Sequence, residues 1–534
     1  MIQPDELKTN EPLLWSTGTG VDVWEMFCAC IAGDVDIVKR LVNKDPSIVR
    51  CNYAYRTPLY FAVRENQLEI VRFLLEQGAD PLSLAVDNSL LEIARDRGYS
   101  EMEMMLEANL ATAQGASPQG ESLAAAIRER DLARVRSLLD ASPELLHAGD
   151  GRSNQPIHWA VMTRQIEIID ELLARGADIN APRFDGARPI QLTNGDYTYR
   201  GWRDVPKEIE TTPREVLDHL RMRGAYVDIN TASSIGDLER VRELLDENPS
   251  LANRVSEYVT YYIGSGAPLK NAAARGHIEI VKLLLDCGAD VNLREEGIAP
   301  RGHALYSAVY NGHYEIAELL LEKGAYANPP VESSADALSI ARMNKDEKMA
   351  ELLCSYGAAR SLDILSYYGD VETAAAIFAV KPELADDPHA LSQAAGNGNE
   401  AFVRLMLHHQ PNLAKRVSGT AKTRELSDFL FERGANPNKT DWLGITALHQ
   451  FAKKSDQDNA GRFIDRGADL NARDEDICST PLGWAAKFGK TEMVEFLLER
   501  GAKPNLPDDP PWATPLAWAK RRGHLEIVEL LENM

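Results

Sequence analysis

A phrase of thirteen residues recurs along the chain, and this repetition constrains the fold more than any other feature. Its first copy runs from Leu68 to Asp80 and reads LEIVRFLLEQGAD. Further copies begin at Ile166, Ile278, Tyr314, Thr491 and Leu525. The glycines that close three successive copies, Gly434, Gly467 and Gly501, lie 33 and 34 residues apart. In a chain of 534 residues, this spacing predicts about 16 stacked repeats.

Each repeat reads as two short helices joined by a tight turn. Thr57 is a suitable N-cap, and Pro58 suits the first helical turn because its missing N–H has no partner there. The apolar residues of Leu68–Leu75 recur at helical spacing and predict an amphipathic second helix. Gly78 then ends it in a left-handed conformation. One such pair cannot bury its apolar face alone, so neighbouring repeats must stack.

The stretch Gly276–Asn292, GHIEIVKLLLDCGADVN, resembles the second helix and following turn of the ankyrin repeat. The opening phrase Thr-Pro-Leu at Thr57, Thr480 and Thr514 resembles the start of the same repeat. From about Val21 onward, the chain resembles the ankyrin repeat family. The resemblance implies an all-α solenoid of helix pairs, with loops that form β-hairpin fingers along one edge.

Two interruptions divide the array. The stretch 111–120 is small, polar and rich in helix breakers, which is typical of a linker. Only 23 residues separate Pro411 from Gly434, so Ala414 to Thr423 is expected to replace a first helix. These features predict an N-terminal extension at 1–20 and three blocks of repeats. The blocks span 21–110, 121–415 and 424–534.

The central block carries extra loop length. Gly176 and Gly224 are 48 residues apart, and further additions predict enlarged finger loops at 184–213, 254–267 and 293–303. Ten of the seventeen tyrosines lie between Tyr197 and Tyr326. Tyr, Trp and Arg are the types that dominate binding hot spots. The candidate binding residues are Asp196, Tyr197, Tyr199, Arg200, Trp202, Tyr258, Tyr261, Tyr262, Glu295, Glu296, Arg301 and His303.

Composition narrows the function classes. With 58 Lys and Arg against 81 Asp and Glu, the net charge of −23 disfavours a nucleic-acid partner. The sequence contains no run of about 18 apolar residues, so we expect no membrane span. Six sparse cysteines suggest free thiols in a reducing, cytoplasmic compartment. No recognised catalytic motif occurs, so we expect no catalytic residue, no metal and no cofactor.

Two hypotheses follow. The first is a non-catalytic scaffold that binds a protein partner through the aromatic-rich loops. The alternative is an enzyme or a small-molecule receptor, for a carbohydrate-like ligand for example, with a pocket formed by the same loops. His158 and His449, in the fourth position of the opening phrase, are expected to bond neighbouring backbone, as the ankyrin resemblance implies.

Overall fold

The computed structural model describes residues 1–13, 16–82, 84–85, 88–114, 118–150, 152–183, 185–196, 198–256, 258, 262–293, 295, 303–328 and 335–533. The chain forms two compact parts. The larger part comprises Asn10–Ala94 and Tyr99–Ala359, and the smaller comprises Met1–Thr9, Arg95–Gly98 and Arg360–Met534. The three-block division stays a prediction.

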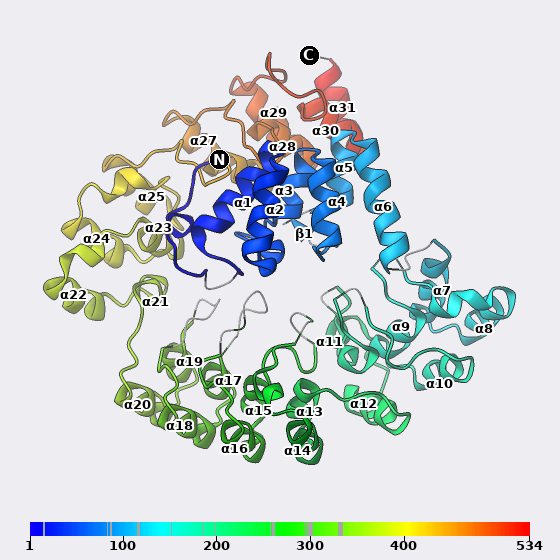
Figure 1. The fold of residues 1–534 in the computed structure, drawn as a ribbon. Coiled ribbons are helices and arrows are strands. Elements are labelled where there is room, and N and C mark those ends of the chain that lie inside the picture. Colours follow the sequence, from blue (N-terminus) through cyan, green and yellow to red (C-terminus); the bar gives the residue numbers. More distant parts are fainter. Residues whose placement is uncertain are drawn as a thin grey trace. The chain divides into compact units, whose positions relative to one another are not determined.

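Short helices in pairs are the main elements of the described structure (Figure 1). Up to residue 359 the α-helices are α1 (Gly20–Ala32), α2 (Val35–Lys44), α3 (Pro58–Arg64), α4 (Leu68–Glu76), α5 (Leu90–Arg97), α6 (Ser100–Gln114), α7 (Pro118–Arg128), α8 (Leu132–Ala141), α9 (Pro156–Met162), α10 (Ile166–Ala174), α11 (Gly201–Asp204), α12 (Pro213–Met222), α13 (Ile229–Ile235), α14 (Leu238–Glu247), α15 (Pro268–Arg275), α16 (Ile278–Asp286), α17 (Ala304–Tyr310), α18 (Tyr314–Glu322), α19 (Ala337–Met343) and α20 (Glu347–Ser355). From residue 360 on they are α21 (Leu362–Tyr368), α22 (Val371–Val380), α23 (Pro388–Asn397), α24 (Glu400–His409), α25 (Arg424–Glu432), α26 (Ala447–Lys454), α27 (Gln457–Ile464), α28 (Pro481–Lys487), α29 (Thr491–Glu499), α30 (Pro515–Arg522) and α31 (Leu525–Glu532).

In the repeat formed by α3 and α4, the predicted N-cap, apolar face and glycine turn are all present. The hydroxyl of Thr57 accepts from the backbone N–H of Tyr60 and caps α3, with Pro58 in the first turn. Ile70, Val71 and Leu74 of α4 are buried. Gly78 follows α4 with φ of +86°, a conformation that glycine adopts without steric cost.

Neighbouring repeats stack through their first helices. In the larger part α13 packs on α15 and α15 on α17, while α14, α16 and α18 form a second layer. Two alanines of α15, Ala272 and Ala273, are fully buried, so small side chains allow this close approach. Fourteen helix pairs and two repeats without a complete first helix give sixteen repeats in the described chain, which confirms the prediction from the period.

Repeats that end in proline close with a short 3-10 helix. These helices are η2 (Pro46–Arg50), η3 (Pro143–His147), η5 (Pro249–Asn253) and η6 (Pro382–Ala385). Three further 3-10 helices are η1 (Asp5–Lys8), η4 (Pro189–Leu192) and η7 (Leu413–Arg416), the last of which follows Pro411. No α-helix occurs between η7 and α25, which confirms that residues 414–423 replace a first helix.

Extended structure is minimal in the described residues. One hairpin pairs β1 (Leu84–Ala85) with β2 (Asn88–Ser89). Other fingers close with single bridges, such as Tyr53 to Arg56, so most fingers are turns rather than ladders. Among the helices of the described chain, none has the length and apolar character that a membrane span requires.

Candidate functional site

The stretch predicted as one enlarged finger, 184–213, is divided by a short helix. A 3-10 helix, η4 (Pro189–Leu192), starts at Pro189, and the side chain of Gln191 accepts from the backbone N–H of Arg188 at 2.7 Å. Since η4 takes the place of a first helix and α12 is the second, most of the extra residues lie between the two helices. The expectation of a single enlarged finger is therefore corrected.

Asp196 anchors the added segment, which is the stretch of extra residues between η4 and α12. One carboxylate oxygen accepts from Arg183 at 3.0 Å, and the other accepts from the backbone N–H groups of Thr198 and Tyr199 at 2.8 and 2.7 Å. Asp196 and Arg183 are both buried. A charge removed from water needs such partners, so this ion pair fixes where the segment turns.

The second enlarged loop, 254–267, is tied to the first by its tyrosines. The Tyr262 hydroxyl donates to Asp185 at 2.9 Å, and Asp185 lies 3.5 Å from the Arg183 guanidinium. The Tyr258 hydroxyl donates to Asp228, which also caps α13. Both tyrosines are buried, and burial raises the pKa of each hydroxyl. These two candidates hold neighbouring loops together.

The third loop contributes two described candidates. The Glu295 carboxylate accepts from the backbone N–H of Ala267 at 2.6 Å, and burial raises its pKa. His303 precedes α17 with φ of +67°. Tyr197, Tyr261, Glu296 and Arg301 lie outside the described residues.

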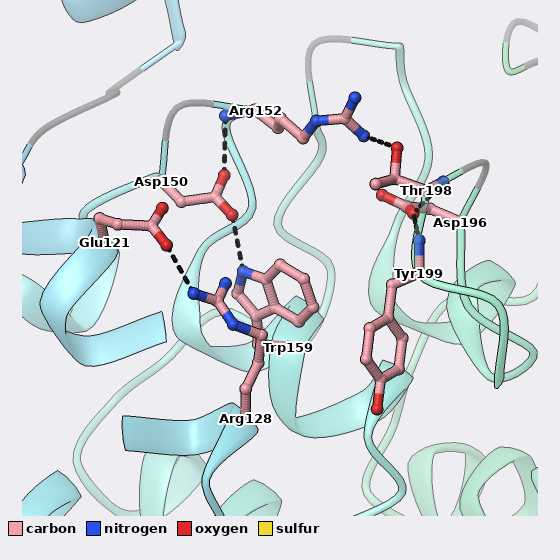
Figure 2. Close-up of a pocket in the computed structure, with 8 residues that line it drawn as sticks. All are labelled: Glu121, Arg128, Asp150, Arg152, Trp159, Asp196, Thr198 and Tyr199. Carbon is pink, nitrogen blue, oxygen red and sulfur yellow. Dashed lines mark hydrogen bonds and ion pairs between the residues drawn. The ribbon is translucent and has the colours of Figure 1, made fainter. Parts of the chain in front are cut away.

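A pocket of about 440 Å³ lies where the added segment faces α7 and α9 (Figure 2). It is lined by Glu121, Arg128, Asp150, Arg152, Trp159, Asp196, Thr198 and Tyr199. Two of these, Asp196 and Tyr199, were predicted from the sequence.

Two aromatic rings and an arginine that is paired with a glutamate line this pocket. The rings of Trp159 and Tyr199 meet edge to face, with centroids 5.4 Å apart at 83°. The Arg128 guanidinium lies 4.6 Å from the Trp159 ring and is paired with Glu121 at 2.5 Å. The indole N–H donates to Asp150 at 2.7 Å. Because Asp150 and Asp196 are bonded within the protein, they hold loops in place rather than present free carboxylates.

Trp202 differs from the other candidates because 78% of its surface is exposed. It lies on α11, and the backbone around it is fixed. Gly201 donates to the carbonyl of Asn194 at 2.9 Å, and the backbone N–H of Arg200 donates to Asp204 at 2.7 Å. Arg200 itself is partly buried. The structure therefore presents one large apolar side chain on a well-bonded loop.

Sequence reasoning missed Arg128, Arg152 and Trp159, which line the pocket, and two arginines beside it. Arg130 lies in the turn between α7 and α8, and Arg164 lies in the same turn of the next repeat, between α9 and α10. Both have a positive φ, at +60° and +58°. Glycine occupies this turn in many other repeats. One sequence signal could have identified Arg130 and Arg164. In two successive repeats, 34 residues apart, an arginine stands where many other repeats have glycine.

The histidines act as expected. In His158 one ring nitrogen accepts from the backbone N–H of Gln155 at 3.0 Å, and the other donates to the carbonyl of Ala181 at 2.9 Å. His449 bonds the backbone at Thr446 and Ser479 in the same way. Both predictions are confirmed.

Comparison with known proteins matches the repeats over most of their extent. A model described as ankyrin repeats (3 copies) matches residues 25–85, 229–331, 269–364 and 418–508, and a model of the single ankyrin repeat matches 154–183.

Individual relatives match over part of their length. A probable E3 ubiquitin-protein ligase, XBOS32 of Oryza sativa subsp. japonica, is 30% identical over 203 residues, covering 33% of this chain and 40% of the relative. The E3 ubiquitin-protein ligase XBAT32 of Arabidopsis thaliana is 31% identical over 198 residues, covering 33% and 38%. The palmitoyltransferase ZDHHC13 of Homo sapiens is 25% identical over 171 residues, covering 31% and 27%. The chain thus spans less than half of each relative. Because the ankyrin model alone matches more than half of its residues, the chain belongs to the ankyrin repeat family.

Proposed function

We propose that this chain is a scaffold that binds another protein, and that the contact is centred on Trp202. The observation that carries the proposal is an indole with 78% of its surface exposed, on α11, where hydrogen bonds of Gly201 to Asn194 and of Arg200 to Asp204 fix the backbone. An exposed tryptophan is unfavourable in water, and tryptophan is among the types most enriched in binding hot spots.

The surroundings of Trp202 suit this role. The Arg203 guanidinium donates to the Asp204 carboxylate and to the carbonyl of Thr198, each at 2.7 Å. Such bonds reduce the entropy lost when a loop is ordered by a partner, so a pre-organised loop binds more tightly. In this proposal Asp196, Tyr258 and Tyr262 hold loops in place, and Arg200, two residues before Trp202, belongs to the contact.

The relatives support a binding role rather than a shared chemistry. Their names describe different activities, ubiquitin ligation and palmitoyl transfer, while the similarity to this chain covers less than half of each protein. A segment that recurs in proteins with different reactions is better explained by recognition than by catalysis.

A matched pair of substitutions tests the proposal. Met222, at the end of α12, has the same exposed fraction as Trp202, 78%. A partner is first identified by cross-linking in the native lysate and then purified. We expect Trp202→Ala to weaken its affinity by at least about tenfold, which corresponds to roughly 1.4 kcal/mol.

Met222→Ala should leave the affinity unchanged, and both variants should melt like the original chain because stability resides in the helix stacks. Equal affinities for Trp202→Ala and the original chain would place the contact elsewhere.

A further inference from the structure

Two arginines beside the pocket occupy a backbone conformation that ordinary side chains avoid. Arg130 follows α7 and Arg164 follows α9, both in the left-handed region, at φ of +60° and +58°. A residue other than glycine gives up on the order of 1 kcal/mol there. Gly236 and Gly276 occupy the same turn in later repeats at φ of +83° and +79°. Strain of this kind often marks a functional position.

Neither arginine has a carboxylate partner in the described part of the chain. Arg130 donates to the carbonyl of Thr163. The Nη2 of Arg164 lies so close to Gly201 that a Cβ there would be 3.0 Å away. The Nε of Arg164 is buried without a hydrogen-bond partner. In a chain with 81 acidic residues, nearby arginines such as Arg134 and Arg175 form ion pairs, so this isolation is specific.

The charges of both arginines act on the Tyr199 hydroxyl. Burial raises the pKa of the Tyr199 hydroxyl, the charges of Arg130, Arg164 and Arg128 lower it, and the charge of Asp204 raises it. Burial also lowers the pKa of Arg130 and of Arg164.

Arg152 also lines the pocket. It donates to the Thr198 hydroxyl and forms no ion pair among the described residues (Figure 2). The acidic residues nearby have other partners. Glu121 pairs with Arg128, Asp196 with Arg183 and Asp204 with Arg203, and Asp150 accepts N–H bonds from Arg152, Asn154 and Trp159.

We propose that Arg130 and Arg164, here called the arginine cluster, bind an anionic side chain of the protein partner, either a carboxylate or a phosphate ester. The inference rests on the proposed function, since Gly201, which Arg164 contacts, directly precedes Trp202. Guanidinium groups recognise both anions through paired, charge-assisted hydrogen bonds. The partner would place an acidic residue beside the apolar group that covers Trp202.

Short peptides test the cluster without a partner. The probes are blocked pentapeptides Gly-Gly-X-Gly-Gly in which X is glutamate, phosphoserine or lysine, together with inorganic phosphate. The full chain carries 5-fluorotryptophan, and Trp159→Phe identifies the fluorine resonance of the pocket indole. We expect the glutamate or phosphoserine peptide to shift this resonance with a dissociation constant on the order of 1 mM, and the lysine peptide to leave it in place.

Substitution to asparagine removes the charge without new strain, because asparagine tolerates the left-handed region. Arg130→Asn with Arg164→Asn should weaken peptide binding by at least about tenfold. Lys345, at φ of +57° in the same turn of a later repeat, provides the matched control, and Lys345→Asn should bind like the original chain.

The proposal is overturned if neither acidic peptide shifts the resonance, if the lysine peptide shifts it equally, or if the double variant binds as well as the control. It is also overturned if inorganic phosphate binds and both acidic peptides do not, because the site then holds a free anion. The Trp202 test is measured separately, so a failure of the arginine cluster and a failure of the proposed function can be told apart.

Discussion

The indole N–H of Trp159 donates a 2.7 Å hydrogen bond to Asp150, which lies in the loop before the helix that carries the tryptophan. The same relationship joins Trp484 to Asp474 at 2.9 Å. Each tryptophan is the fourth residue of its helix, α9 or α28. Each aspartate also accepts backbone N–H bonds from its own turn, such as that of Ile477 to Asp474 at 2.8 Å. In each case one buried carboxylate accepts hydrogen bonds from the backbone of the finger loop and from the tryptophan of the helix that follows it.

Removing that charge should loosen the finger. In Asp150→Asn the amide NH₂ faces groups that also donate, so at least one buried N–H loses its acceptor. We expect the free energy of unfolding to fall by about 1–3 kcal/mol, measured by urea denaturation. Asp474→Asn should show a similar loss, whereas Asp140→Asn, at an exposed position, should change little. Loss from all three alike would contradict this role.

Local signals explain why most of the fold was predictable. The cap at Thr57, the glycine turn at Gly78 and the helix-ending Pro249 act within a few residues. The short interval between Pro411 and Gly434 was enough to predict a missing helix.

The candidate site was less predictable because it depends on contacts between distant residues in a segment without a period. Sequence inspection placed Tyr262 among binding residues, but its bond to Asp185 spans 77 positions. The Trp159 ring lies in a regular repeat, and only the folded chain brings it against Tyr199. Exposure separates Trp202 from the buried candidates, and no sequence pattern encodes that difference.

Acid should destabilise the repeat around His158. Burial lowers its pKa to about 3, whereas an unfolded histidine titrates near 6.5. Between these values the unfolded chain binds the proton, so stability is full above pH 6.5 and falls as the pH drops.

From pH 6.5 to 5 this histidine should account for a loss of about 2 kcal/mol. His158→Gln, which can keep both hydrogen bonds, should show a flatter dependence of the urea midpoint on pH. Identical pH profiles for the two proteins would refute the assignment.

Glu295 should have the opposite dependence. Burial raises its pKa in the folded chain, so the folded state holds the proton more firmly than the unfolded state, which loses it near pH 4.3. Stability then falls as the pH rises above that value. We expect Glu295→Gln to gain in urea midpoint relative to the original chain from pH 4 to pH 7. Glu239→Gln, at an exposed position, is the control, and a gain of the same size there would remove the argument.

The joint around residue 418 should open before the helices on either side. Lys415 and Lys422 are exposed in a stretch without an α-helix, and solenoid repeats are coupled through their nearest neighbours. Phe431 of α25 packs against both the core of residues 365–435 and the core of residues 448–531. Its loss should therefore uncouple the two sides.

We expect trypsin to cut the native chain first at Lys415–Lys422, and Phe431→Ala to accelerate that cut by about tenfold or more, as a loss of roughly 1.4 kcal/mol or more would produce. Phe496 in α29 is the matched control, because it is also partly buried and has an arginine 4.8 Å from its ring, as Phe431 has. Phe496→Ala removes a similar ring from inside the last stack and should leave cleavage at the joint unchanged. Equal acceleration by both variants would mean that the last repeats unfold as one unit with the rest, and first cuts within α23 or α28 would show that the missing helix creates no weak point.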